Sequence, residues 1–201
     1  LLITFIPKNI IQRIPNMVFY FAIDILLILI LLLIYRKDLK VEWNLFKNNW
    51  KGYLEENISY WIVGLVLMAF FNLVIANIIS KDLPENEQLI RTMMKEMPIY
   101  MLFTTVVAAP FTEEIIYRKS LKDIFQKEKI YIIISGILFG FAHVIYSFEG
   151  ILDFLYIVPY GILGSAFALM YFKTKTVFVP MTFHFIHNFL SIALTLLLNL
   201  L

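Results

Sequence analysis

The sequence predicts an all-α bundle of transmembrane helices, and three observations support this prediction. Of the 201 residues, 61% are hydrophobic and only 16% are charged, and the mean hydropathy is +0.80. Apolar runs close to the ~20 residues that span a bilayer recur along the whole chain. In hydrocarbon every backbone amide needs an internal partner, and these runs are too long and unbroken for barrel strands, so each is expected to be a helix.

Hydropathy predicts about six spans, at residues 17–35, 60–79, 98–117, 130–146, 151–172 and 177–201. We expect residues 1–97, with two spans and their loops, to pack with residues 98–201 as one membrane domain. The polar segment 80–96 is expected to be a surface loop or a short amphipathic helix. Residues 1–6 resemble the end of an apolar segment and the first residue is not Met, so the chain is expected to begin inside a longer protein.

The basic residues predict an orientation, because Lys and Arg accumulate on the cytoplasmic side of membrane proteins. Twelve of them lie in the segments after the first, third and fifth expected spans, and five lie on the other side. The five are Lys8, Arg13, Lys81, Arg91 and Lys95. We therefore expect the three basic segments in the cytoplasm. The richness in Ile, Lys and Asn favours a bacterial cell membrane.

Composition also excludes several classes of function. A net charge of +2 without a basic run interleaved with aromatics argues against nucleic acid as a partner. The chain has no cysteine, which excludes disulfides, thiolate metal sites and a cysteine nucleophile.

Small residues mark where two of the expected helices approach closely. Gly136 and Gly140 form a GxxxG pair, and Gly161 and Ser165 repeat the spacing in the next span. Such pairs let helix backbones pack against each other within a membrane. We expect these two helices to be in contact.

Polar residues gather in three of the apolar spans. The sequences are Pro110-Phe-Thr-Glu-Glu-Ile-Ile-Tyr-Arg118, Phe139-Gly-Phe-Ala-His143 and His184-Phe-Ile-His-Asn188, which contain every histidine of the chain. An ionisable side chain in a bilayer costs on the order of 3 kcal/mol, so a set of this kind indicates a shared purpose.

Helical spacing sorts these residues. Glu114 and Arg118 are four apart, with the acid toward the N-terminus, which favours an ion pair. Glu113 is rotated by about 100° and remains the freer carboxylate. By the same spacing, Phe139 shares a face with His143, and His184 shares one with Asn188.

This set suits hydrolysis by an activated water. A desolvated carboxylate beside an imidazole can hold a water and take its proton, as Glu113 with His143 would. A histidine N–H and an asparagine amide can stabilise an oxyanion, as His184 with Asn188 would. No serine lies in a nucleophile-elbow pattern.

The three motifs, in this order, resemble the CPBP or Abi family, which includes the type II CAAX prenyl endopeptidases. The resemblance covers about residues 98–201 and makes that part the expected catalytic core. It implies the same four catalytic residues, namely Glu113, His143, His184 and Asn188. We expect Glu114, Arg118 and Phe139 to support them, and we expect no cofactor. It implies membrane-associated peptide or protein substrates, and in bacteria processing or immunity functions linked to bacteriocins.

Two alternatives stay open. Two histidines and a glutamate suffice for a catalytic zinc, although no H-E-x-x-H helix occurs and His184 and His187 are only three apart. The second alternative is a non-enzymatic scaffold, immunity or transport protein that uses the polar cluster for binding.

A difference in depth needs an explanation. Counted at ~1.5 Å per residue, Glu113 lies close to the cytoplasmic boundary of its span, whereas His143 lies deep in its own. We therefore expect either that residue 130 and its neighbours protrude from the membrane, or that Arg118 does not mark the end of the third span.

Overall fold

The structure is a computed structural model that describes residues 16–79, 85–145 and 150–197, and every element in these ranges is a helix. The elements in chain order are α2 (Asn16–Ile79), α3 (Glu85–Glu96), α4 (Pro98–Phe103), η2 (Thr104–Ala108), α5 (Ala109–Glu114), η3 (Ile115–Ser120), α6 (Leu121–Ile124), α7 (Glu128–Val144), η4 (Ile151–Tyr156), α8 (Ile157–Thr174) and α9 (Phe178–Leu197). Several features expected from the sequence lie outside the described residues: the apolar start at residues 1–6, the charges Lys8, Arg13 and Lys81, and residues 146 and 198–201 at the ends of two spans.

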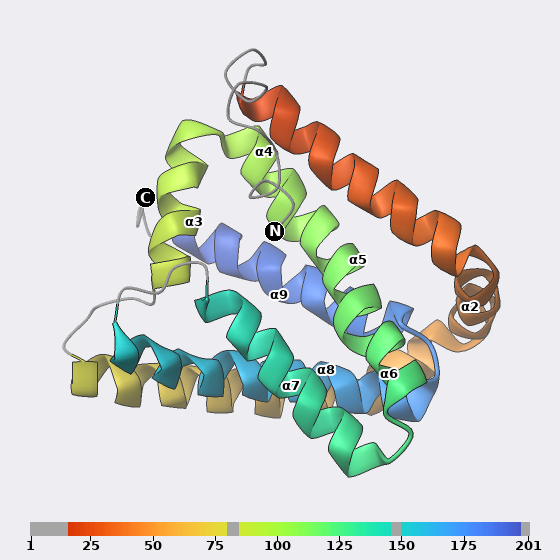
Figure 1. The fold of residues 1–201 in the computed structure, drawn as a ribbon. Helices are drawn as coiled ribbons and strands as arrows, with labels where there is room; N and C mark the ends of the chain where they lie inside the picture. The colour runs from red at the N-terminus through yellow and green to blue at the C-terminus, as the bar shows by residue number, and fades with distance from the viewer. Residues whose placement is uncertain (1–15, 80–84, 146–149, 198–201) are drawn as a thin grey trace.

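Both N-terminal spans lie in one bent helix, α2. Figure 1 shows its two long arms meeting in a bend, and Asn49 within the helix has non-helical torsions, φ −143° and ψ 30°. The segment between the two expected spans is therefore helical. The basic residues of that segment lie in the bend region instead of in a loop.

The third span is a composite helix from Pro98 to Ile124. Two π-helical stretches, η2 and η3, flank the short α5 that carries Glu113 and Glu114. Proline cannot donate the backbone hydrogen bond that its position in a helix requires, so Pro110 accounts for the first irregularity. π-Bulges of this kind occur often at functional sites.

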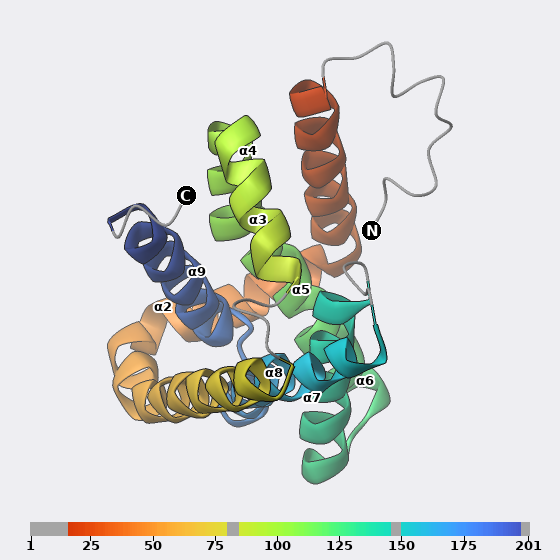
Figure 2. The ribbon, with the colours of Figure 1, turned by 90° about the vertical axis from the view of Figure 1, so that its left-hand side faces the viewer.

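The all-α membrane fold is confirmed. Four helical stretches among the described residues are long and apolar enough to cross a membrane, namely Met17–Ile78, Pro98–Ile124, Ile151–Thr174 and Phe178–Leu197. The count differs from six because both arms of α2 form one element and α7 is only 17 residues long. The polar segment before Pro98 contains a real helix, α3, which is seen beside α4 in Figure 2.

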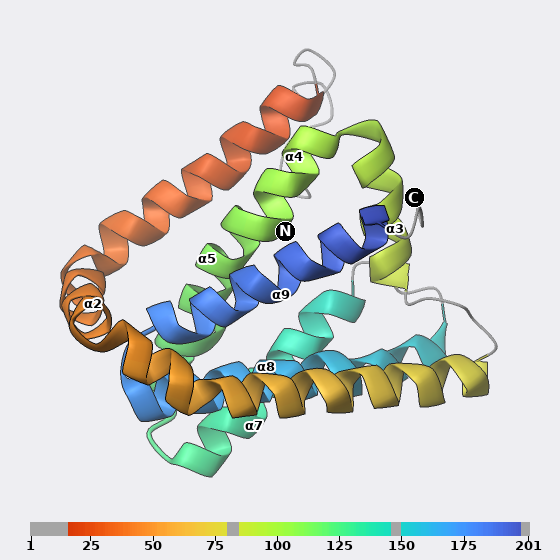
Figure 3. The same ribbon diagram turned by 180° about the vertical axis from the view of Figure 1, so that it is seen from behind.

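α7 and α8 pack closely, as the small residues predicted. A Cβ atom on Gly140 would lie 2.4 Å from the carbonyl oxygen of Ile157, and one on Gly136 would lie 2.7 Å from that of Gly161. The backbones therefore touch where the two small-residue pairs face each other. Seen from behind in Figure 3, the second arm of α2 runs along α8, while α9 crosses toward α3.

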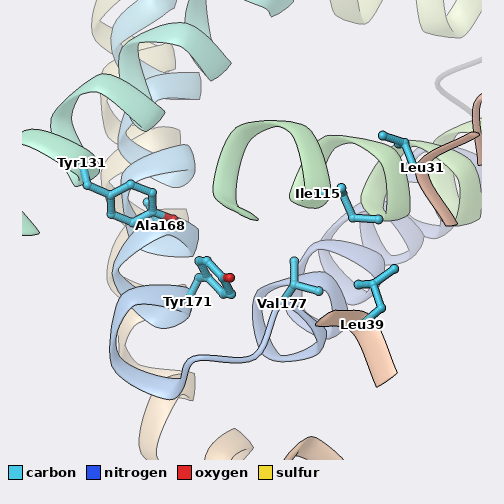
Figure 4. Close-up of a cluster of buried hydrophobic side chains, with 7 residues drawn as sticks. All are labelled: Leu31, Leu39, Ile115, Tyr131, Ala168, Tyr171 and Val177. Carbon is cyan, nitrogen blue, oxygen red and sulfur yellow. The ribbon is translucent and has the colours of Figure 1, made fainter. Parts of the chain in front are cut away.

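A buried cluster joins the first arm of α2 to the other helices. Figure 4 shows its seven side chains, which are Leu31, Leu39, Ile115, Tyr131, Ala168, Tyr171 and Val177. Beside it, the buried Glu42 accepts hydrogen bonds from the Val177 N–H (2.8 Å) and the Tyr171 hydroxyl (3.1 Å) and pairs with Lys119 Nζ at 3.0 Å. Glu42 thus connects α2 to the start of α9, the helix that carries His184.

Candidate active site

A buried ion pair forms the base of the site. Both Glu114 and Arg118 have no solvent exposure. Arg118 Nη2 donates to Glu114 Oε1 at 3.2 Å, and its Nε lies 2.9 Å from Oε2, although that N–H does not point at the oxygen. The guanidinium also donates to Ser135 Oγ (3.1 Å) and stacks on Phe139, with its carbon 4.6 Å from the ring centroid. The predicted pair is therefore present, and Phe139 supports it.

The Glu114 carboxylate also holds His184. Nδ1 of His184 lies 2.9 Å from Glu114 Oε1, and because the carboxylate accepts, this nitrogen carries the proton. The imidazole stacks on Phe167, with ring centroids 5.1 Å apart. Phe167 thus holds one face of the ring and Glu114 holds its Nδ1 edge, so Nε2 is directed away from Glu114.

Glu113 is the freer carboxylate, as predicted. Its side chain is 26% exposed, yet Oε2 is buried and accepts no hydrogen bond from any described residue. That oxygen lies 3.8 Å from Nε2 of His184, which is too long for a direct hydrogen bond. The two adjacent glutamates thus face opposite nitrogens of one histidine, a relationship that helical spacing alone did not predict.

His143 reaches the same region from α7. Its Nδ1 lies 2.8 Å from the Phe139 carbonyl, an acceptor, so the neutral ring has its proton on Nδ1 and an accepting lone pair on Nε2. The ring packs on Phe139 at 4.4 Å and on Tyr160 at 4.6 Å between centroids. Phe139 also lies edge-on to His184, with ring centroids 5.8 Å apart, so His143 and His184 meet around the same aromatic ring.

Asn188 binds backbone in addition to sharing a helix face with His184. Its Nδ2 donates to the Thr105 carbonyl at 2.8 Å, in the π-helical η2. One amide hydrogen is occupied by this bond, and the second is the one left for an oxyanion. His187 lies between His184 and Asn188 on α9, and its buried Nδ1 has no hydrogen-bond partner among the described residues.

Sequence reasoning missed the aromatic walls of the site. Tyr160 and Phe167 of α8 stack on His143 and His184 respectively. They are seven residues apart and so share a helix face, but nothing separates them from the other aromatics of an apolar span. Ser135 holds Arg118 and donates to the Tyr117 carbonyl at 2.6 Å, which is a supporting role.

The structure of the third span bears on the difference in depth expected between Glu113 and His143. Its helical run continues past Arg118 to Ile124, and Arg118 is buried instead of lying at a boundary. This agrees with the second of the two expectations, and the position of residue 130 relative to the membrane stays a prediction. Within the described ranges, no three His, Asp or Glu side chains are arranged to hold a metal ion.

Comparison with known proteins adds independent support. Residues 95–190 match the family model described as type II CAAX prenyl endopeptidase Rce1-like. This part of the chain, slightly less than half of it, is therefore similar to the Rce1-like family. All of the predicted site residues, from Glu113 to Asn188, lie inside the matched range. This similarity supports peptidase activity in general, whereas the roles of the individual residues remain predictions.

The similar proteins are bacterial. The chain is 29% identical over 107 residues to YdiL of Bacillus subtilis (strain 168), a candidate membrane peptidase by name. The aligned region covers 52% of this chain and 40% of the relative. It is 26% identical to UPF0177 protein YvdC of Lactococcus lactis subsp. lactis (strain IL1403), covering 76% of this chain and 58% of the relative. It is also 26% identical to the membrane-embedded CAAX protease MroQ of Staphylococcus aureus (strain USA300), covering 65% and 55%.

The chain therefore spans 40% to 58% of the length of these relatives. No solved structure matches it.

Proposed function

We propose that the chain is an intramembrane endopeptidase that hydrolyses a peptide bond with a water activated by Glu113 and His143. The observation that carries the proposal is the pair of adjacent glutamates around His184. Glu114 is neutralised by Arg118 and used to orient the ring, while Oε2 of Glu113 is buried and has no described hydrogen-bond partner. An unpaired carboxylate oxygen is costly to bury unless it has another use.

Glu113 acts as the general base in this proposal. A water bound to its free oxygen would give up one proton as the water oxygen attacks the carbonyl carbon of the peptide. The lone pair on Nε2 of His143 accepts the other hydrogen of that water and orients it. The proton held by Glu113 then passes to the nitrogen of the leaving amine as the C–N bond breaks, which leaves a carboxylic acid and an amine.

His184 and Asn188 stabilise the oxyanion that develops on the carbonyl oxygen. His184 already donates through Nδ1 to Glu114, so it must carry a second proton on Nε2 in the reacting state. The second amide hydrogen of Asn188 is the other donor. Its Nδ2 is fixed by Thr105 before substrate binds, and such preorganised donors stabilise a transition state efficiently.

The substrate class follows from the surroundings of the site. The site residues lie on helices that are apolar enough to cross a membrane or that pack against such helices. We therefore propose a membrane-associated peptide or protein as substrate, in keeping with the name of MroQ as a membrane-embedded CAAX protease. We further propose a multi-pass protein of a bacterial cell membrane, with its basic segments in the cytoplasm.

The test compares the membrane peptidomes of cells that carry the native chain and Glu113→Gln at equal expression. The glutamine keeps the size and hydrogen bonding of the side chain but removes the base. Peptides that disappear in the variant identify both activity and substrate. An unchanged peptidome together with an unchanged phenotype would favour the scaffold, immunity or transport alternative.

Zinc dependence has a separate test. The three histidines and Glu113 lie in one region, but not in the geometry of a metal site within the described residues. We expect the activity to survive prolonged chelation. Loss of activity on chelation and its return with added Zn²⁺ would replace the proposed mechanism by a metallopeptidase mechanism.

A further inference from the structure

A second polar site lies between α2 and α8. A cavity of about 360 Å³ opens there, and its lining residues are Tyr53, Glu56, Asn57, Tyr60, Lys173 and Thr174. The four α2 residues follow the spacing of one helix face. None of the six belongs to the candidate active site, so the cavity needs an explanation of its own.

Asn57 indicates that the cavity receives a hydrogen-bond donor. The residue is only 3% exposed, and its Nδ2 donates to the Tyr53 carbonyl at 2.8 Å. Its Oδ1 is buried and accepts no hydrogen bond from the described part of the chain. Buried amide oxygens are nearly always paired, and leaving one unpaired is costly. A ligand with an N–H or O–H group would supply the missing partner.

Charges of both signs border the same cavity. Glu56 contributes an exposed carboxylate from α2. Lys173 contributes an ammonium from the end of α8, which lies 4.4 Å from the centroid of the Tyr60 ring and donates to the hydroxyl of that residue. Tyr60 therefore holds the Lys173 ammonium at the cavity wall. A ligand that carries one positive and one negative group matches this wall better than a simple anion, which would meet Glu56.

The cavity lies where helices leave the apolar layer. Lys173 and Thr174 are at the end of the candidate span Ile151–Thr174, and the next candidate span begins at Phe178. On α2, Tyr53 follows the kink at Asn49 and the basic bend region. Headgroups of phospholipids lie at this depth of a bilayer.

We propose that this cavity binds a phospholipid headgroup that carries a phosphate and a primary ammonium, as in phosphatidylethanolamine. The ammonium donates to Asn57 Oδ1 and faces the Glu56 carboxylate, and the phosphate faces Lys173. A choline headgroup has no N–H to donate to Asn57. A phosphatidylglycerol headgroup has no positive charge for Glu56.

The experiment measures lipid binding to the full chain. The chain is purified in detergent and titrated with short-chain phosphatidylethanolamine, phosphatidylcholine and phosphatidylglycerol, and bound lipid is counted by native mass spectrometry. Soluble phosphoethanolamine, added as a competitor, separates headgroup recognition from binding that requires the acyl chains. A free peptide added in the same way tests whether the cavity binds peptide instead.

We expect phosphatidylethanolamine to bind about tenfold more tightly than the other two lipids. A difference of this size is what one hydrogen bond to a charged group contributes. Lys173→Gln should weaken the binding of all three lipids, because each carries a phosphate, and Glu56→Gln should abolish the preference over phosphatidylglycerol. The matched variants Glu55→Gln and Lys175→Gln, which change exposed neighbours that do not line the cavity, should retain it. Equal binding of the three lipids, equal loss in the matched variants, or displacement by the peptide alone would overturn the proposal.

Discussion

Oε2 of Glu113 lies 3.8 Å from Nε2 of His184, too far for a hydrogen bond, and no described group donates a hydrogen bond to that oxygen. The opposite nitrogen of the same ring is held at 2.9 Å by Glu114. The imidazole of His184 thus lies between Glu114, whose carboxylate is ion-paired with Arg118, and Glu113, whose Oε2 has no described hydrogen-bond partner. This difference is the reason why we propose Glu113 as the general base and Glu114 as the residue that orients His184.

Arg118→Met should destabilise the protein by about 3–5 kcal/mol, because it leaves the buried Glu114 carboxylate without its counter-ion. The double variant with Glu114→Gln should regain part of that stability, since no unpaired charge remains. Unfolding in detergent measures both. Arg91 offers a matched control, because it pairs with Glu87 at the same spacing but is partly exposed. Arg91→Met should cost less than about 1 kcal/mol, and an equal cost for both arginines would contradict this account.

Asn188→Leu should lower kcat by about 10²–10³ with little change in KM, the usual effect of losing one oxyanion donor. The change also leaves the Thr105 carbonyl without its partner, so the stability of the variant is measured in parallel. Asn77→Leu is the control, because the Asn77 amide is exposed and only bonds the Leu73 carbonyl of its own helix. A rise in KM at constant kcat would assign Asn188 to substrate binding instead.

Gly140→Ala should destabilise the chain by about 3 kcal/mol, at the upper end of overpacking costs, because the new Cβ meets backbone of α8 and not a movable side chain. Gly150→Ala should have almost no effect, since a Cβ there meets no atom of the described residues within 4 Å. Thermal unfolding of the two variants in the same detergent checks the contrast. Comparable stabilities would show that α7 and α8 are not packed as described.

Glu42→Gln should cost about 1–3 kcal/mol, because it weakens the hydrogen bond to the Val177 N–H at the start of α9 and removes the charge opposite Lys119. Asp38→Asn, at a partner of Lys119 that is 58% exposed, should change stability by less than about 1 kcal/mol. If both substitutions have the same small effect, Glu42 does not position α9.

The fold class and two contacts of the candidate site could be predicted because each left a periodic signal. Apolar runs indicated the helices, and spacings of four indicated the Glu114 pair with Arg118 and the packing of Phe139 on His143. The close contact of α7 and α8 was also predictable, since Gly136 and Gly140 exclude a Cβ at regular spacing.

Contacts between distant segments left no such signal. The placement of His184 between Glu113 and Glu114 depends on how α9 crosses α5, which helical periodicity does not specify. Glu42 was not recognised because its partners lie on segments far along the chain, and a carboxylate near basic residues resembles an ordinary surface charge. The first two spans were expected to be separate because the polar segment between them resembles a loop, whereas in the structure it continues the helix α2.

The most direct test of the central claim is the rate at which the purified native chain and its Glu113→Gln variant hydrolyse a substrate peptide found by the peptidome comparison. Equal unfolding temperatures of the two proteins, and full activity of Glu96→Gln at an exposed glutamate of α3, are the controls. The account predicts a loss of about 10²–10⁴ for Glu113→Gln, the contribution of a general base. A folded Glu113→Gln variant that hydrolyses the peptide at the native rate would contradict it.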